Sequence, residues 1–240
     1  MKEPESIPRY LRAKKYLLQQ IKSLQARNNQ LEPENALAEK LGISRETVRK
    51  AMMSLIQEGV ITRWHGKGNF GHPAVTNLSM RIDLNSDFRR ILVESGYAVR
   101  SFRSKSEERD ASDSMRKRML ESEEKTVVAY DLDIYGDDVL AVQGKVELFR
   151  EIVISLPPEG EYNDSMNSTL REHCVSESNH TTAWLLAENN PEIAKRFSLI
   201  PDTPLLCWEE IYYNLYDEKM GFVKVFFNPK IMNLSFLLKF

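Results

Sequence analysis

The stretch Ala36-Leu37-Ala38-Glu39-Lys40-Leu41-Gly42-Ile43-Ser44-Arg45-Glu46-Thr47-Val48-Arg49-Lys50-Ala51-Met52-Met53-Ser54-Leu55 decides the fold of the N-terminal part of this 240-residue chain. Its first half places Leu37, Ala38 and Leu41 on one helical face, and Gly42 follows as a stop signal. Ser44 is a good N-cap for a second helix, whose apolar residues recur at three- and four-residue spacing: Val48, Ala51, Met52 and Leu55. The stretch therefore predicts two short helices joined by a tight turn.

The outward face of the second helix is basic and polar. Four such side chains fall in its first two turns: Arg45, Thr47, Arg49 and Lys50. A recognition helix presents these turns to the major groove of DNA. For this stretch alone, a small helical hairpin with a solvated basic face is the alternative.

Residues 57–70 predict a β-hairpin directly after that helix. Gly59 ends the helix, residues 60–64 suit a strand, and Asn69-Phe70 begins the return strand. At the tip, one lysine lies between two glycines in the run His65-Gly66-Lys67-Gly68. Because glycine permits close approach, this tip can bring backbone N–H groups and a cation to phosphate or into the minor groove. The hairpin therefore reads as the wing of a winged helix.

These residues resemble the winged helix-turn-helix of the GntR family of bacterial transcription regulators. Four segments carry the resemblance in the family's order and spacing: residues 31–34, 37–51 and 58–63, and the wing tip at 66–68. The family usually carries a DNA-contacting Arg after the Glu matched by Glu34, whereas this chain has Asn35, which can bond a phosphate or base edge but lacks the charge. The resemblance implies a DNA interface made of Asn35, Ser44, Arg45, Thr47, Arg49, Lys50, His65, Gly66, Lys67 and Gly68.

Length and charge indicate two domains with different tasks. A chain of 240 residues can bury two cores, and Pro and small polar residues at 72–77 suggest a linker, so we predict a DNA-binding domain at 1–75 and a second domain at 82–240. The formal net charge of −2 hides an asymmetry, because residues 1–78 hold 13 Lys and Arg against 7 Asp and Glu. The positive part is the part that resembles a DNA reader.

The N-terminus has no signal-peptide pattern, and no apolar run approaches about 18 residues, so we expect a soluble, cytoplasmic protein. Cys174 and Cys207 lack metal-ligand spacing, and buried, reduced thiols are expected rather than a disulfide.

Residues 82–240 predict an α+β domain with an antiparallel sheet. Alternating runs at 125–135 and 139–149 flank the turn Gly136-Asp137-Asp138, and two more strand-like runs lie at 204–213 and 221–227, with a third at 234–240. Helices are expected near 86–97, 111–119, 165–174 and 191–197, while 183–187 fits a strand or a helix. In the N-terminal part, a long helix is expected from Ile7-Pro8 to about Asn28.

This second part resembles the UTRA effector domain of the HutC branch of GntR regulators, whose fold is like that of chorismate lyase. The order of elements carries the resemblance: the helix ending at Gly96-Tyr97, the short helix before the hairpin at 130–142, the segment 191–206 and the hairpin at 213–227. It implies a domain that binds a small effector in a pocket beside the sheet and pairs with a second copy.

The charges expected in that pocket are reversed. Many UTRA domains carry Arg-Leu-Arg where this chain has Asp131-Leu132-Asp133, and another Arg in the strand that holds Glu210. On this alignment the pocket would repel a phosphosugar and favour a cation or polyol. Alternation along the strands completes the expected lining: Asp131, Asp133, Tyr135, Gln143, Lys145, Glu210, Tyr212 and Lys224. Two alternatives stay open: the carboxylates face solvent or pair with Lys145 and Lys224 across the sheet, or the domain binds no effector.

Neither catalysis nor a metal or cofactor is expected. The chain has no Gly-rich phosphate loop, no HExxH motif and no nucleophile elbow, and its histidines are scattered: His65, His72, His173 and His180. We predict a homodimeric, sequence-specific DNA-binding regulator, a repressor rather than an activator, that responds to a small effector. The alternatives are an effector domain used only for dimerisation or partner binding, and a winged-helix module that binds protein or RNA.

Overall fold

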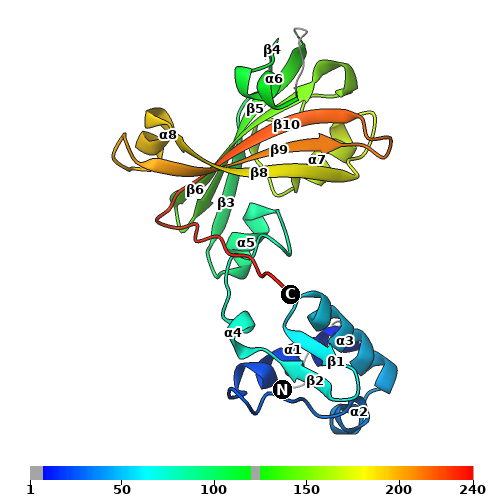
Figure 1. The fold of residues 1–240 in the computed structure, drawn as a ribbon. Helices are drawn as coiled ribbons and strands as arrows, with labels where there is room; N and C mark the ends of the chain where they lie inside the picture. The colour runs from blue at the N-terminus through cyan, green and yellow to red at the C-terminus, as the bar shows by residue number, and fades with distance from the viewer. Residues whose placement is uncertain (1–7, 120–124, 240) are drawn as a thin grey trace. The chain divides into compact units, whose positions relative to one another are not determined.

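The computed structural model describes residues 8–119 and 125–239. The chain forms two compact units, residues 1–84 together with 235–240, and residues 85–234 (Figure 1). The chain therefore passes between the units twice, at 84–85 and at 234–235. The architecture is α+β, as the sequence predicts, with helices and a two-stranded hairpin in the first unit and a large antiparallel sheet in the second.

The first unit is a three-helix core followed by a hairpin. Its elements are α1 (Arg9–Lys22), α2 (Glu34–Leu41), α3 (Arg45–Gln57), β1 (Ile61–Trp64), β2 (Gly68–Gly71) and α4 (Pro73–Thr76). α1 and α3 supply most of the core, through Leu17 and Ile21 on one side and Val48, Met52 and Leu55 on the other. Burial of this apolar stripe sets which face of α3 stays outside.

The first helix is shorter than expected. It ends at Lys22 rather than near Asn28, and residues 29–31 run beside the hairpin instead. The backbone N–H of Gly71 donates to the Asn29 carbonyl at 2.8 Å, and the N–H of Leu31 donates to the Asn69 carbonyl at 2.8 Å. These bonds satisfy backbone groups of β2 that would otherwise lie on an open sheet edge.

The C-terminal segment 235–239 packs on the first unit. The backbone of Ser235 pairs with residues 80–82, since its N–H donates to the Met80 carbonyl at 3.0 Å and its carbonyl accepts from the Ile82 N–H at 2.9 Å. Farther on, Lys239 Nζ donates to the carbonyls of Ile56 at 3.2 Å and Gln57 at 2.7 Å. The strand expected at 234–240 is thus a single bridge followed by a segment that caps α3, and these residues leave the domain predicted at 82–240.

The second unit is an eight-stranded antiparallel sheet with the order β7-β3-β5-β6-β10-β9-β8, and β4 pairs with β5 off this path. The strands are β3 (Val99–Arg103), β4 (Glu107–Asp110), β5 (Thr126–Gly136), β6 (Val139–Phe149), β7 (Gly160–Glu161), β8 (His180–Asn189), β9 (Pro204–Tyr213) and β10 (Lys219–Phe227). The helices are α5 (Phe88–Glu94), α6 (Asp113–Met119), α7 (Met166–His173) and α8 (Pro191–Arg196), with a short 3-10 turn η1 (Arg150–Ile152).

Most predicted elements of this unit are present, and three strands that were not predicted are added: β3, β4 and β7. The hairpin at 125–149 has its turn at Asp137 and Asp138, both with positive φ, and residues 183–187 lie in strand β8. β3 and β4 were not predicted, because their sequences are short and polar and their pairing to β5 depends on a distant part of the chain.

The helices divide between the two faces of this sheet. Phe88 of α5 meets Trp208 and Phe227 edge-on at 5.9 and 4.8 Å, and α7 lies on the same face, where Thr169 contacts Arg103. The other face carries α6 and α8, whose apolar residues pack on separate patches of the sheet. The face beneath α5 and α7 is the one that holds the cavity described below.

Candidate DNA-binding surface and ligand cavity

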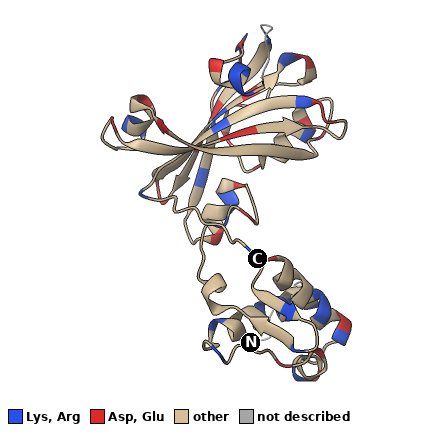
Figure 2. Cartoon of the chain, in the orientation of Figure 1, with Lys and Arg blue, Asp and Glu red and all other residues tan. Residues whose placement is uncertain are grey.

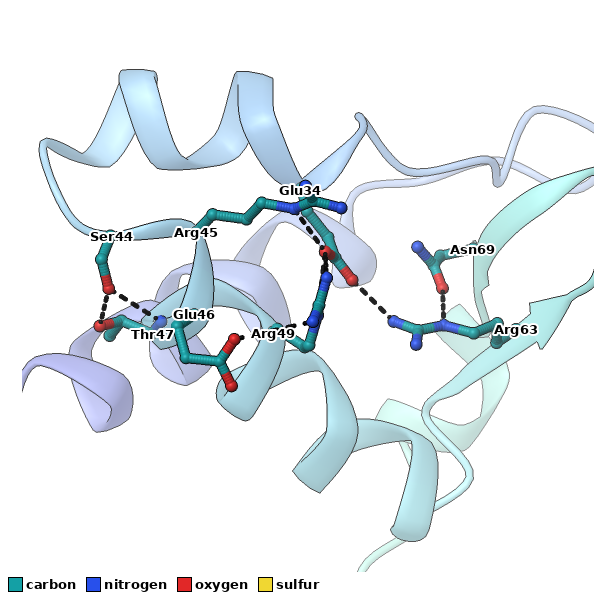
Figure 3. A network of polar contacts seen from close by, with 8 residues as sticks. All are labelled: Glu34, Ser44, Arg45, Glu46, Thr47, Arg49, Arg63 and Asn69. Carbon is teal, nitrogen blue, oxygen red and sulfur yellow. Dashed lines mark hydrogen bonds and ion pairs between the residues drawn. The ribbon is translucent and has the colours of Figure 1, made fainter.

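The start of α3 is built by its own sequence. Gly42 ends α2 in the left-handed conformation, with φ of 61°, and lets the chain turn at once into the next helix. Ser44 caps α3, because its Oγ accepts the backbone N–H of Thr47 at 3.1 Å and lies 2.7 Å from the Thr47 hydroxyl (Figure 3). Two of the predicted DNA-binding residues thus fix the end of the helix that would enter the groove.

Three arginines converge on one carboxylate beside that helix end. Glu34, from the first turn of α2, accepts from Arg45 Nε at 3.2 Å, from Arg49 Nη2 at 3.2 Å and from Arg63 Nη2 at 2.9 Å (Figure 3). The Glu34 side chain is only 12% exposed, whereas the arginines stay largely open to solvent. The arrangement holds guanidinium groups from α3 and from the wing in one fixed cluster, which we call the Glu34 cluster: Glu34, Arg45, Arg49 and Arg63.

The charge of Glu34 is set by this cluster. Burial alone would raise the pKa of the Glu34 carboxyl, but hydrogen bonds from Arg45 and Arg49 and the charges of Arg49 and Arg63 lower it by more. The carboxylate is therefore ionised at neutral pH and orients the arginines, while their outer N–H groups stay available. Sequence reasoning placed Glu34 and Arg63 in family motifs but did not predict that they meet, because the contact joins three separate elements.

The other end of α3 is capped from outside the helix. Arg81 Nη1 donates to the Glu58 carbonyl at 2.8 Å, and Lys239 holds the two carbonyls before it. No basic residue lies in the helix's own last turn. Cations at a helix C-terminus are stabilising, so Arg81 and Lys239 supply from outside the positive charge that the last turn of α3 does not carry.

The wing tip has the conformation that its glycines allow. Gly66 and Gly68 have φ of 74° and 109°, and His65, Gly66, Lys67 and Gly68 are all exposed. Lys67 Nζ lies 4.2 Å from the centre of the Trp64 ring, and its backbone carbonyl accepts from Gln30. Stacking on Trp64 holds the only lysine of the tip beside the backbone N–H groups expected to approach DNA.

The remaining predicted residues lie around the start of α3. Lys50 Nζ lies 4.8 Å from the centre of the Tyr10 ring, and Asn35 is exposed in the first turn of α2. A groove of about 550 Å³ is lined by residues from α1 and α3: Arg9, Tyr10, Ser44, Glu46, Thr47, Arg49, Lys50 and Met53. Arg9 and Tyr10 were missed as part of this surface, because their sequence suggests only one amphipathic helix.

Basic and acidic residues are coloured along both units in Figure 2, so the charge asymmetry seen in the sequence is one of net count. In the first unit, five basic residues lie on α3 and on the wing: Arg45, Arg49, Lys50, Arg63 and Lys67.

The eight residues expected to line one pocket divide between the two faces of the large sheet. Cross-strand pairing puts Asp131, Lys145 and Lys224 on one face, because Lys145 lies opposite both of the others. Glu210 lies opposite Val223, the neighbour of Lys224, and therefore faces the other way. The single acidic pocket expected from the sequence is thus not formed.

Six of the eight residues lie on the α6 and α8 side, where the charged ones have partners. Asp133 accepts from Arg196 at 2.5 Å, and Lys224 contacts Glu188 and, at 3.2 Å, Glu209. Asp131 faces Lys145; burial raises the pKa of its carboxyl, although the Lys145 charge opposes this. The two others are Gln143, 3.5 Å from Asp131, and Tyr135, edge-on to Phe102 at 5.9 Å.

Glu210 and Tyr212 line a cavity on the other face of the sheet. It lies between the sheet and the α5 and α7 side, measures about 80 Å³, and is walled by apolar side chains that include Leu132, Ile134, Val223 and Val225. An adjoining polar hollow of about 410 Å³ shares Glu210, Tyr212, Ser86 and Ser165 with it. The cavity also holds two arginines that the sequence did not single out, Arg89 and Arg103, and lacks Asp131 and Asp133, on which the expected acidic character of the pocket rested.

The fold and the clustered cations of the first unit define a winged helix-turn-helix DNA-binding domain. Residues 9–70 match the family model "Bacterial regulatory proteins, gntR family". The first unit is therefore similar to the DNA-binding domain of GntR regulators, which agrees with the resemblance found in the sequence.

Known relatives agree with this assignment. The "Uncharacterized HTH-type transcriptional regulator YurK" of Bacillus subtilis is 39% identical over 66 residues, which are 27% of each chain. The "Probable fructoselysine utilization operon transcriptional repressor" of Escherichia coli is 46% identical over 41 residues, which are 17% of each chain. The chain thus spans only about a quarter or less of these relatives' lengths.

Similarity along the whole chain is found in structure. The solved structure of the "possible transcriptional regulator YydK" from Bacillus subtilis aligns with 98% of this chain and 100% of its own, with a TM-score of 0.65 and 15% identity. At that identity the likeness concerns the fold, which the two share across both units.

Within residues 8–119 and 125–239, no helix is long and apolar enough to cross a membrane, and no group of three or more His, Cys, Asp or Glu side chains could hold a metal ion. Cys174 and Cys207 are buried free thiols, and burial raises the pKa of each to about 11.

Proposed function

We propose that this chain is a sequence-specific DNA-binding transcription regulator. The observation that carries the proposal is the Glu34 cluster, which fixes arginines of the recognition helix and of the wing in one orientation. Fixed guanidinium forks suit bidentate contacts to guanine or phosphate, whereas freely rotating ones serve mainly as charge. In this role Arg45, Thr47 and Arg49 meet base edges and phosphates, Asn35, Ser44 and Lys50 support them, and His65 to Gly68 follow the adjacent groove.

We further propose that the second unit is a UTRA-like effector domain of the HutC branch and that the protein acts as a homodimer. Two copies would read a two-fold operator whose half-sites lie about one helical turn apart, roughly 34 to 36 Å. The cavity that holds Arg103 and Glu210 supports effector binding over a purely structural domain, because buried charges facing an internal space suit a ligand better than a packed core. Repression is the mode that the E. coli relative's name suggests.

Selection from a random duplex pool tests the proposal. The full chain is incubated with random-sequence DNA, bound duplexes are recovered and sequenced, and the same is done with Arg49→Ala. We expect a two-fold symmetric motif for the wild type and a weakened or relaxed motif for the variant. Recovery of unenriched sequence would reject specific reading and favour a general winged-helix module, and tighter binding to RNA than to duplex DNA would do the same.

A further inference from the structure

The cavity of the second unit contains a buried guanidinium without a counter-charge. Arg103 is 4% exposed and forms no ion pair with any residue in 8–119 or 125–239. Its Nη2 donates to Thr169 Oγ1 at 3.0 Å and its Nη1 to the Pro158 carbonyl at 3.3 Å, while its Nε has no partner. The rings of Tyr130 and Tyr162 lie 5.5 and 4.9 Å from its guanidinium carbon. A buried charge held only by neutral groups is costly unless something supplies the opposite charge.

A second arginine stands at the same wall of the cavity. Arg89 Nε donates to Ser101 Oγ at 2.9 Å, and its Nη2 donates to Asn163 Oδ1 at 2.6 Å, so it too is held by neutral partners. Besides Glu210, two carboxylates line the cavity. Asp87 is engaged by the backbone N–H groups at the start of α5, and Asp164 is exposed. The buried part of the cavity is therefore positive at this wall.

Glu210 brings a buried carboxyl to the place where the cavity meets the polar hollow. It is 3% exposed, and its hydrogen-bond donors are neutral, with Trp208 Nε1 at 3.2 Å. Burial raises the pKa of Glu210, and hydrogen bonds from Thr181, Tyr212 and Trp208 only partly offset this. The hollow is also lined by Arg90, which is paired with Glu94, and by His180, whose Nε2 lies 3.1 Å from Asp217 Oδ1.

Size limits what can fill the inner cavity. Its volume of about 80 Å³ is roughly half that of a cavity known to hold benzene. A single carboxylate or phosphate group fits such a space, whereas a ring does not. The rest of a ligand would lie past Glu210 in the larger hollow, among Asn167, Asn179 and Thr181.

We propose that this site binds a small zwitterion, with its carboxylate or phosphate on Arg103 and Arg89 and its ammonium group on Glu210. The unpaired Arg103 and the uncompensated Glu210 are complementary to the two ends of one molecule, and each would gain a partner on binding. This inference rests on the proposed effector-binding role of the second unit. It replaces the cation or polyol expected from the sequence, since the side chains of Asp131 and Asp133 lie on the other face.

The test is a thermal-shift and calorimetric panel on the full chain. The probes are amino acids and phosphoethanolamine, together with analogues of each that lack the amino group, such as 2-hydroxy acids, or that lack the acid, such as ethanolamine. A true ligand at 100 times its Kd should raise Tm by about 5 °C or more, while both truncated analogues should bind at least roughly tenfold more weakly.

Variants locate the binding. Arg103→Gln should abolish the Tm shift caused by the zwitterion. Glu210→Gln should weaken binding of the zwitterion and leave the affinity for the analogue without an amino group unchanged. Lys145→Gln removes one positive charge from the opposite face and should bind like the wild type. Since Arg103 is buried, the Tm without ligand and binding to a selected duplex show whether Arg103→Gln is folded.

Several outcomes would overturn the proposal. One is a panel in which no zwitterion binds, and another is a ligand that binds Arg103→Gln as tightly as the wild type. If a polyol or a cation binds in the cavity and changes the affinity for DNA, the proposal of a zwitterionic ligand is wrong, but the proposed effector role of the second unit stands. A zwitterion that binds through Arg103 without changing the affinity for DNA would support the ligand class and reject the effector role.

Discussion

Replacing Glu34 separates two effects of this residue on DNA binding: the orientation of the three arginines and the negative charge of the carboxylate. Glu34→Gln removes a carboxylate from the surface that would face DNA, so charge alone would strengthen binding to phosphate. We expect specific binding to weaken instead, because Arg45, Arg49 and Arg63 lose the group that orients them at 2.9 to 3.2 Å. Loss of one well-placed Arg contact with a base costs about 1 to 3 kcal/mol, which is roughly 5- to 150-fold in affinity for the selected duplex.

The cost to folding should be smaller than the cost to binding. The three arginines are 58%, 42% and 40% exposed, and exposed ion pairs each contribute about 0.2 to 1 kcal/mol. Gln also keeps the shape of the side chain and one accepting oxygen. We therefore expect the free energy of unfolding to fall by about 1 kcal/mol, which leaves the domain folded during the binding assay.

Glu46→Gln is the matched control. Glu46 lies in the first turn of α3, its side chain is 80% exposed, and it pairs with Arg49 at 3.7 Å. Fluorescence anisotropy with the selected duplex and a shuffled duplex should show a specific loss for Glu34→Gln and unchanged or slightly tighter binding for Glu46→Gln. If both variants bind the selected duplex more tightly than the wild type, the arginines leave Glu34 on binding and the reasoning is refuted.

Three further predictions follow from buried or capping groups. Arg81 and Lys239 both cap α3, but only Arg81 is buried. In urea titrations, Arg81→Ala should therefore lower the free energy of unfolding of the first unit by about 1 to 3 kcal/mol, and Lys239→Ala by about 0.5 kcal/mol. Equal effects of the two variants would contradict this explanation. Native Cys174 and Cys207 should react with iodoacetamide at pH 7 roughly 100-fold more slowly than the unfolded chain, since burial raises their pKa to about 11; rapid labelling of native protein would show open thiols. The pKa of Glu210 is near 4.5 in the unfolded chain and higher in the folded protein, so the protein loses stability as pH rises through this range and Glu210 ionises. Glu210→Gln should therefore make the fall of Tm with pH less steep. An unchanged dependence of Tm on pH would mean that Glu210 ionises in the folded protein without cost.

The DNA-binding unit was predictable because its signals are local. Gly42 and Ser44 end one helix and begin the next within three positions, and the wing is closed by glycines at its tip. The end of α1 was not predictable in this way, since it depends on bonds from residues 29–31 to β2, 40 residues farther along the chain.

The ligand cavity shows the opposite case. Alternation correctly indicates which residues of one strand share a face, but not which of the two faces is hollow. That choice depends on where α5 and α7 pack, and these helices carry no signal of their own for a cavity. Arg103 was overlooked for a related reason, because it ends a five-residue strand that is recognisable only by its pairing with β5.

The packing of the C-terminal segment was also beyond sequence reasoning. An apolar run at 234–240 resembles a strand, yet only Ser235 pairs, while Leu237 and Lys239 approach Gly59. Gly59 has φ of 72°, and a Cβ there would lie within 2.6 Å of both side chains. The same glycine thus ends α3 and leaves room for a segment almost 180 residues later in the chain.

The most direct test of the account is the ratio of affinities of the full chain for the selected duplex and for a shuffled duplex of the same composition, measured by anisotropy from about 50 to 200 mM salt. We predict a ratio of at least roughly 1,000 for the wild type, and for Arg49→Ala a ratio about 10- to 100-fold lower, with little change in binding to the shuffled duplex. Equal affinity of the wild type for both duplexes at every salt concentration would contradict sequence-specific reading by α3.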